Sequence, residues 1–321
     1  MRRPVPRSRR PLLVAGAAAA ALVAAASLTW AQGGRSTAPS ARDVAAPVAA
    51  QAEPVSLATR PTKVLTIVEE NRSGVSALSS MPYLGTLSRT YGYTTAWQAV
   101  THPSLPNYLA LASGSTYGVK DDLAPSAHPL RGQTVFDQAI ARGRTAKTYA
   151  ESMPSPCSLS SYGRYAVKHN PWAYFSDAAS RANCRRNDVP AGTVTAGALR
   201  NDVVNGRLPN VGMLIPDMCS DGHDCSSATA DGWLRRWLPV IMAGPDYRAG
   251  RLAIVVTFDE DDRTAGNRIL TTVIAPRTTH LVVGPGVVGH YSWTRYADEL
   301  VGAPLLRGAA TARSMRAPFH L

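Results

Sequence analysis

The sequence predicts an α/β fold, a single domain with a mostly parallel central sheet and helices on both of its faces. Short apolar runs rich in β-branched residues alternate with segments whose apolar positions recur every three or four residues. The runs are nearly continuous, which is typical of parallel strands that are buried on both faces. The chain has 321 residues, 45% of them hydrophobic, and this is enough apolar material for such a core.

The elements follow from these patterns in chain order. Strands are predicted at residues 63–68, 211–215, 252–258 and 271–275. Helices are predicted at residues 81–91, 134–142 and 227–242, and a last helix is expected to start within 296–300. Acidic residues follow the first three of these strands. Because ligands bind at the carboxyl ends of strands in such folds, the acidic strand ends are candidate site residues.

The first 60 residues are predicted to lie outside the working domain. Five arginines in the first ten residues precede an uncharged Ala/Leu/Val stretch at 11–30, and small residues around Trp30 suit a cleavage site. This pattern predicts a secretory signal peptide over 1–31. The stretch is also long enough to span a bilayer, so an uncleaved anchor is the alternative. Residues 32–60, rich in Ala and Pro, predict a flexible linker, which leaves 61–321 as an exported domain, secreted or membrane-anchored.

Export places the four cysteines in an oxidising compartment. The favoured pairs are Cys157 with Cys184 and Cys219 with Cys225, because each pair encloses a short polar segment. Other pairings, reduced thiols and metal binding are the alternatives. The net charge is +12, and beyond the N-terminal arginines the basic residues form no run. Such a surface suits anionic substrates, or solubility alone, better than nucleic acid.

Two acidic groups are expected at one edge of the sheet. Glu70 and Asn71 follow the first strand, and Asp259 and Glu260 follow a later one. Carboxylates that are buried together repel unless a proton or a cation neutralises them, and a metal ion is the natural counter-charge. A solvated acidic loop is the alternative.

A second acidic group follows the strand at 211–215. Asp217, Asp221, His223 and Asp224 lie within nine residues, and a bridge between the flanking cysteines would fix their loop. Carboxylates with one imidazole suit zinc, manganese or a direct hydrogen bond to substrate. A capped surface turn is the alternative.

A candidate nucleophile lies in the segment 101–108. Pro103 and Pro106 are expected to hold the backbone extended around Ser104. Serine needs an adjacent base or a metal ion to become a nucleophile. The chain has no Gly-x-Ser-x-Gly elbow, so a metal-activated serine fits better than a conventional Ser-His-Asp esterase.

Six segments, in this order, resemble the acid phosphatase and phospholipase C phosphoesterase family of the alkaline phosphatase superfamily. They are Ile67–Ser73, Thr101–Tyr108, His169–Trp172, Pro216–Ser226, Thr257–Glu260 and Gly289–Ser292. The resemblance extends over residues 63–306. Ser104–Gly114 also overlays, without a gap, the pattern Thr-Phe-Pro-Asn-His-Tyr-x-x-x-Thr-Gly of the superfamily's nucleotide pyrophosphatases. The overlay implies that Ser104 is the nucleophile and that Asn107 binds a phosphoryl oxygen.

The resemblance also implies a divalent metal site. Its expected ligands are Glu70, Asn71, Ser104, Asp259 and Glu260 in one half, and Asp221, His223 and His290 in the other, with Asp217 competing for the place of Asp221. Two-zinc members carry Asp-His where Asp259 and Glu260 stand. Oxygen ligands alone favour calcium, magnesium or manganese over zinc. With a single ion, the side chains left to bind phosphate directly are those of His169, His223 and His290.

The small secreted acid phosphatases of this family, including ones similar to phosphatidylinositol 3-phosphate phosphatases, are closer in length and motif than its large bacterial phospholipases C. The sequence therefore predicts a metal-dependent phosphatase that hydrolyses phosphate monoesters through a phosphoserine. A phospholipase C-type phosphodiesterase and a non-catalytic secreted binding protein are the alternatives. The expected partner is a small phosphorylated substrate or a phospholipid head group. The chain is expected to be a monomer. Membrane contact is expected only through the N-terminal segment.

Overall fold

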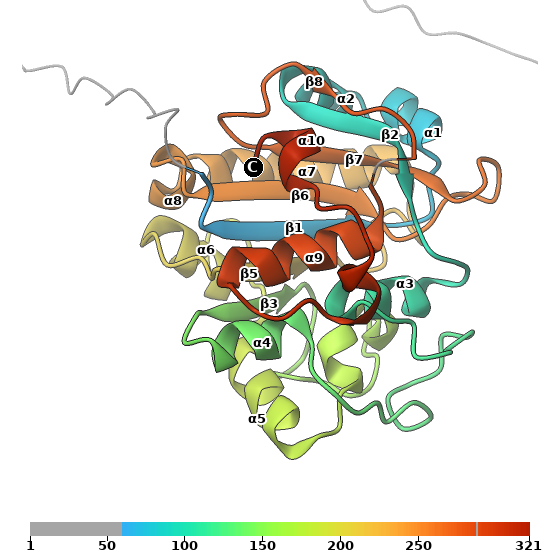
Figure 1. The fold of residues 1–321 in the computed structure, drawn as a ribbon, viewed down its shortest axis with the longest axis vertical. Coiled ribbons are helices and arrows are strands. Elements are labelled where there is room, and N and C mark those ends of the chain that lie inside the picture. Colours follow the sequence, from blue (N-terminus) through green and yellow to red (C-terminus); the bar gives the residue numbers. More distant parts are fainter. Residues whose placement is uncertain (1–59, 287) are drawn as a thin grey trace, which may run out of the picture. The chain divides into compact units, whose positions relative to one another are not determined.

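Eight strands form one sheet in the order β4-β3-β5-β1-β6-β7-β2-β8 (Figure 1). The structure, a computed structural model, describes residues 60–286 and 288–321, so the predicted signal peptide and linker lie outside the described residues. The strands are β1 (Lys63–Glu69), β2 (Gly92–Gln98), β3 (Ala146–Ala150), β4 (Asp188–Pro190), β5 (Val211–Ile215), β6 (Leu252–Phe258), β7 (Arg268–Ile274) and β8 (Leu281–Val282).

The central strands run parallel, as predicted. β1 pairs in parallel with β5 on one side and with β6 on the other, so that Leu65 lies between Gly212 and Ile254. β3 continues the parallel sheet between β5 and β4. Only β7 runs antiparallel to its neighbours, β6 and β2, within the described sheet. Residues 64–69 of β1 are all buried, which is expected of a parallel strand covered on both faces.

Helices cover both faces of the sheet. α3, α4 and α9 pack together on one face, where Trp293 of α9 donates a hydrogen bond to Thr66 of β1 over 2.6 Å. α1, α2 and α6 pack with α7 on the other face (Figure 1). The helices are α1 (Gly74–Ser80), α2 (Pro82–Thr90), α3 (Ser104–Ser113), α4 (Val135–Ala141), α5 (Ala178–Asn187), α6 (Ala198–Val204), α7 (Ser227–Met242), α8 (Pro245–Arg248), α9 (His290–Val301) and α10 (Arg316–Phe319). Short 3₁₀ segments are η1 (Val167–His169), η2 (Pro171–Tyr174) and η3 (Arg307–Ala310).

The segment around Ser104 differs from the prediction. Instead of an extended loop, Ser104 begins α3, and Pro106 occupies the first turn of that helix. The first turn tolerates proline because its N–H groups have no acceptor within the helix. α9 likewise begins earlier than expected, at His290. Both changes move a predicted site residue from a loop to the first position of a helix.

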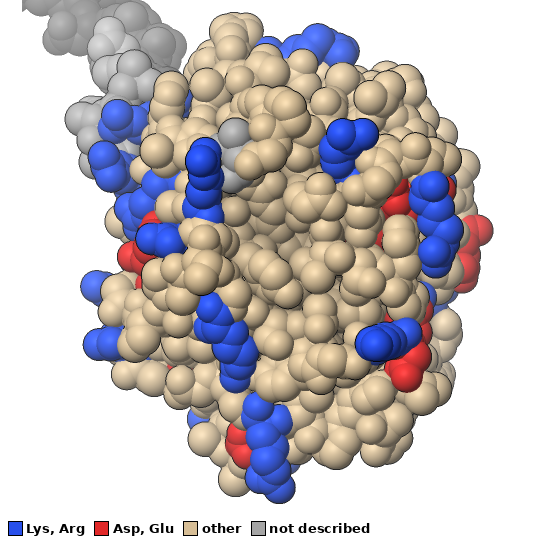
Figure 2. Space-filling model, turned by 45° about the vertical axis from the view of Figure 1, so that its right-hand side comes forward, with Lys and Arg blue, Asp and Glu red and all other residues tan. Residues whose placement is uncertain are grey.

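Both favoured disulfides are present, Cys157 with Cys184 and Cys219 with Cys225. The second one closes the acidic loop that follows β5. Within residues 60–286 and 288–321, no helix has the length and apolar character needed to cross a membrane. On the face shown in Figure 2, Lys and Arg side chains lie singly or in small groups around a largely uncharged centre. This distribution agrees with the absence of a basic run in the sequence.

Candidate active site

The candidate site lies at the carboxyl ends of three neighbouring strands. Glu70 directly follows β1, Asp259 directly follows β6, and Asp221 lies in the loop after β5. Backbone hydrogen bonds of 3.0 Å, from Glu70 N to Asp221 O and from Asp259 N to Glu69 O, hold the three segments together. The parallel order β5-β1-β6 thus brings the predicted carboxylates to one edge of the sheet.

Helix α3 presents two hydroxyl groups to Glu70. Ser104, the first residue of the helix, donates to Glu70 Oε2 over 3.1 Å. Tyr108 donates to Glu70 Oε1 over 2.7 Å, because residues four apart lie on the same helix face. At the same helix end, Leu105 N donates to Asp122 Oδ1 over 2.9 Å, and a carboxylate is favourable at this position. Ser104 is therefore held against a buried carboxylate by a well-anchored helix start.

His169 and Asp221 complete the buried cluster. The ring nitrogens of His169 lie 3.3 Å from Glu70 Oε1 and 3.2 Å from Asp221 Oδ2. Neither contact has hydrogen-bond geometry, and neither nitrogen has another hydrogen-bond partner among the described residues. The His169 ring stacks on Tyr108, with centroids 4.9 Å apart. Ligand atoms of Glu70, His169 and Asp221 lie within 4.8 Å of one another, so they converge on a common point.

Burial leaves these carboxylates short of compensating charge. Burial, followed by the repulsion of Glu260, raises the pKa of Asp259 to about 8. Burial also raises the pKa of Asp221 to about 7, and it raises the pKa of Glu70 well above its ordinary value with a further contribution from Asp259. The pKa of His169 falls well below its ordinary value because the ring is buried and lies near Lys168. A neutral imidazole among buried carboxylates leaves a lone pair free for a cation.

The donor set fits a divalent metal ion. Oδ2 of Asp221 and Oδ2 of Asp259 are buried and have no hydrogen-bond partner in the described part of the chain, like the two nitrogens of His169. Buried polar atoms are normally paired, so unpaired ones that converge need an external partner. Carboxylate oxygens with one imidazole suit zinc or manganese as well as harder ions. His169, predicted to bind phosphate, thus lies where a metal ligand would lie.

Asn71 lies at the turn between β1 and α1. Its backbone φ of 53° is in the left-handed region, which asparagine tolerates better than most residues. Its backbone N–H donates to Asp259 Oδ1 over 3.2 Å, and its side-chain amide donates to Glu70 Oε2 over 3.0 Å. Asn71 therefore connects the two carboxylates predicted to share a metal ion with it.

Glu260 and Asn107 are hydrogen-bonded to each other. Asn107 Nδ2 donates to Glu260 Oε2 over 3.1 Å, while its Oδ1 accepts from Val100 N and Thr101 N. The second Glu260 oxygen lies 3.0 Å from His102 Nδ1. These contacts use the Asn107 amide to fix the loop before α3, so they disfavour its predicted contact with a phosphoryl oxygen.

His290 is also engaged at both nitrogens. Its Nδ1 accepts from Trp97 Nε1 over 3.1 Å, and its Nε2 lies 2.6 Å from the backbone oxygen of Asp259. Burial lowers the pKa of His290 to about 4, so the neutral ring donates through Nε2. In this arrangement His290 orients the Asp259 backbone, and no lone pair remains for the predicted metal contact.

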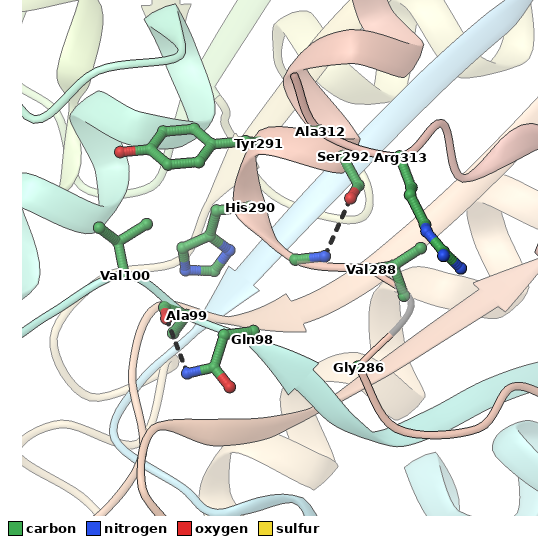
Figure 3. Close-up of a pocket in the computed structure, with 11 residues that line it drawn as sticks. Gln98, Ala99, Val100, Gly286, Val288, His290, Tyr291, Ser292, Ala312 and Arg313 are labelled. Carbon is green, nitrogen blue, oxygen red and sulfur yellow. Dashed lines mark hydrogen bonds between the residues drawn. The ribbon is translucent and has the colours of Figure 1, made fainter. Parts of the chain in front are cut away.

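A cavity of about 560 Å³ opens on the other side of His290. Figure 3 shows the His290 ring between the segment that follows β2, at Ala99 and Val100, and Tyr291 of α9. Arg313 and Tyr291 also line this cavity, and its described lining contains no carboxylate. The cavity is therefore separate from the acidic cluster.

Asp217 and Asp221 were alternative candidates for one metal-ligand position, and Asp221 is the one that reaches the cluster. Asp217 instead accepts hydrogen bonds from the backbone of Cys219 and Ser220 and from Ser152 Oγ. It therefore caps the disulfide-closed loop.

His223 lies at the mouth of the site together with Lys168, which the sequence analysis did not single out. Lys168 Nζ lies 3.0 Å from Asp122 Oδ2 and 3.3 Å from His223 Nε2. Because an ammonium group only donates, His223 Nε2 accepts and Nδ1–H donates to Asp224 over 2.7 Å. Burial lowers the pKa of Lys168, but Asp122 outweighs burial and the net shift is upward. The sequence offered one signal for Lys168, because it directly precedes the segment His169–Trp172 that resembles the family.

Comparisons with known proteins agree with this geometry. The sequence model of the Phosphoesterase family matches residues 74–294. A phosphatidylinositol-3-phosphatase of Mycobacterium tuberculosis is 31% identical over 251 residues, which are 75% of this chain and 77% of that protein. An acid phosphatase of Aspergillus fumigatus is 28% identical over 189 residues, 56% of this chain but only 41% of that protein.

Solved structures show a similar fold at low sequence identity. A protein in the alkaline phosphatase superfamily from Vibrio parahaemolyticus superposes with a TM-score of 0.51 at 10% identity. The match covers 81% of this chain and 72% of that one. This likeness confirms the predicted alkaline-phosphatase-like fold.

Proposed function

The chain belongs to the Phosphoesterase family, and on that premise we propose that it is an exported, metal-dependent phosphatase that hydrolyses phosphate monoesters through a phosphoserine at Ser104. The observation that carries the proposal is the convergence of the Ser104 hydroxyl, three buried carboxylates and a neutral imidazole at one edge of the sheet. A serine hydroxyl is a weak nucleophile unless a base or a cation lowers the cost of losing its proton.

Glu70, His169, Asp221 and Asp259 would hold the metal ion, with Asn71 and Glu260 beside them. A bound divalent ion would neutralise the carboxylates and stabilise negative charge on phosphoryl oxygens. Phosphoryl transfer needs mainly such charge compensation and accurate positioning. Lys168 supplies further positive charge at the mouth of the site. The charges of Glu70 and Asp259 help to raise the pKa of its ammonium group.

The chain's own groups provide the proton path at the nucleophile. Ser104 Oγ already donates to Glu70 Oε2, so Glu70 receives its proton as Oγ attacks phosphorus. The bond from phosphorus to the leaving oxygen breaks. The leaving oxygen takes one proton from solvent, and Glu70 returns the Ser104 proton to solvent, so the number of protons is unchanged. Water then attacks the phosphoserine, the bond from Ser104 to phosphorus breaks, and the two protons of water end on Ser104 and on phosphate.

Relatives support the finer parts of the proposal. A phosphatidylinositol-3-phosphatase and several acid phosphatases are among the similar proteins, so phosphoinositides or smaller phosphate monoesters are the candidate substrates. Two disulfides favour an oxidising compartment, in agreement with the predicted signal peptide.

The test is hydrolysis of a chromogenic aryl phosphate and of the matching diester, across pH, with chelator and metal add-back. Monoester turnover that is lost with chelator and restored by a divalent ion is expected. A preference for the diester would replace the phosphatase with the phospholipase C-type alternative. Absence of turnover for both esters would contradict the proposed enzyme.

A further inference from the structure

We propose that the cavity beside Lys168 binds the leaving group, and that it selects a polyhydroxylated alcohol that carries no second phosphate monoester. The cavity has a volume of about 490 Å³, and its polar lining includes Asp122, Ser160, Ser161, Lys168 and Asp224. This inference rests on the proposed phosphatase function and names its substrate class. It concerns a different cavity from the one beside His290.

The cavity adjoins the nucleophile through Asp122. Asp122 Oδ1 accepts from the backbone of Leu105, the residue after Ser104, and Asp122 Oδ2 accepts from Lys168. Lys168 in turn precedes His169 of the buried cluster. Asp122 in the cavity wall thus contacts the residue after Ser104. The alcohol part of a bound phosphate ester lies across phosphorus from Ser104, and we place it in this cavity.

The lining suits hydroxyl groups. Carboxylates such as Asp122 and Asp224 only accept hydrogen bonds, and alcohol O–H groups are the matching donors. Ser161 Oγ accepts from Val167 N over 3.0 Å and keeps its own O–H to donate, while Ser160 is exposed on the same rim. A few polar groups at fixed positions are what orients a small ligand in a pocket.

The charge of the lining disfavours a second phosphate. Two carboxylates face one ammonium group, and that ammonium is already paired with Asp122. A second phosphate dianion in the cavity would meet Asp224 without a free cation among the described lining residues, and like charges at close range repel. Repulsion of this kind is an effective way to reject a competing substrate.

The first test compares kcat/KM of the full chain for fructose 6-phosphate, fructose 1,6-bisphosphate and an aryl phosphate. At least a tenfold preference for the monophosphate over the bisphosphate is expected. Equal or better turnover of the bisphosphate would overturn the inference while aryl phosphate turnover leaves the proposed function intact. Failure of all three esters would instead count against the proposed function itself.

Two pairs of variants separate the cavity from its surroundings. Ser160→Phe, which adds a ring at the rim of the cavity, should lower the ratio of fructose 6-phosphate to aryl phosphate turnover at least fivefold. The exposed Ser126→Phe, outside the lining, should keep that ratio. Asp224→Asn should weaken discrimination against the bisphosphate about threefold, whereas Asp121→Asn, which lines a neighbouring cavity, should not. Equal behaviour within both pairs would contradict the assignment.

A polyol phosphate can be soluble or part of a lipid head group. Soluble inositol 3-phosphate and phosphatidylinositol 3-phosphate in detergent micelles share the same ring hydroxyl groups, except the one that the lipid esterifies. Ser160→Phe is expected to lower turnover of both substrates. Turnover of the wild-type chain shows which source it accepts, and an unchanged rate for both substrates in the variant would refute the leaving-group site.

Discussion

Two groups of buried carboxylates in this protein have opposite surroundings. Asp246, behind the amino end of β1, accepts from Lys63 Nζ at 2.7 Å, from Arg251 Nη2 at 2.8 Å and from Leu208 N at 3.1 Å. Asp221 and Asp259, at the carboxyl end of the same part of the sheet, are just as buried. Each keeps one oxygen with no hydrogen-bond partner among the described residues.

The difference separates a structural carboxylate from a functional one. A buried carboxylate with complete partners contributes to the fold, and removing its partners is costly. A buried carboxylate without them destabilises the free protein until a cation or substrate arrives. Mutations at the two ends of the sheet should therefore affect different properties, stability at Asp246 and ion binding with catalysis at Asp259.

The largest expected effect is on Ser104→Ala. Loss of a catalytic nucleophile lowers kcat by several powers of ten in comparable enzymes, so a decrease of at least about 10³-fold is expected. Because the hydroxyl donates a single hydrogen bond, to Glu70, bound metal measured by elemental analysis should stay unchanged. Ser88→Ala, a buried serine paired with Thr272, is the control and should keep kcat. Retained turnover in Ser104→Ala would remove the nucleophile from the site.

The second effect tests the comparison directly. Asp259→Asn should lose bound metal and should reduce kcat by more than the ~10–100-fold typical of residues that only support a ligand. Asp246→Asn should keep kcat and bound metal. Its free energy of unfolding should fall by roughly 3 kcal/mol, as expected when a buried ion pair is broken. Elemental analysis, kinetics and denaturant unfolding of both variants measure this. Full metal content in Asp259→Asn would contradict the metal site.

Much of this site was predictable because parallel strands place their carboxyl ends together. Glu70, Asp221 and Asp259 follow continuous apolar runs, and the sheet order then brings them to one edge. The Cys219–Cys225 pairing could also be predicted from local sequence, because a six-residue separation encloses one polar loop. These predictions needed only local pattern and the geometry of parallel sheets.

What could not be predicted depends on contacts between distant segments. His290 is fixed by Trp97 and the backbone oxygen of Asp259, which are distant in the sequence. Asn107 is fixed by the backbone of the loop before α3, including Val100. A local sequence pattern does not predict these contacts. Strands β2 and β3 were missed because their sequences, GYTTAWQ and AKTYA, lack a continuous apolar run. The two prolines near Ser104 suggested extended backbone, although a helix start accommodates Pro106 equally well.

The third effect concerns Tyr108, which supports the cluster without reaching substrate in the proposed mechanism. Tyr108→Phe removes the hydrogen bond to Glu70 but keeps the ring that stacks on His169. Metal affinity should fall by about 10-fold, the lower end for a residue that orients a ligand. Tyr149→Phe, which loses a similar bond to Asp202 far from the site, is the matched control. Equal metal affinity in both variants would show that the Tyr108 hydroxyl does not orient Glu70.

The smallest effect is a pH dependence of stability in chelator. The folded-state pKa values of Asp221, Asp259 and Glu260 lie at about 7, 8 and 7, above their ordinary values, because burial disfavours the charged forms. The folded protein then binds protons more tightly than the unfolded chain, so this stabilisation is present at low pH and is lost as pH rises through 7 to 8. Between pH 5 and 8 the melting temperature in chelator should fall, by about 2–4 °C for each kcal/mol.

A divalent ion should reverse this trend, because it binds the charged carboxylates and competes with their protons. Added metal is therefore expected to raise the melting temperature more at pH 8 than at pH 5. Asp246→Asn should keep the same pH dependence, since its carboxylate already has permanent partners. Asp259→Asn should reduce it, because Asp221 and Glu260 remain. If the melting temperature of the wild-type chain in chelator is the same at both pH values, ionisation of the unpaired carboxylates does not destabilise the fold. The proposed difference between the two ends of the sheet would then be wrong.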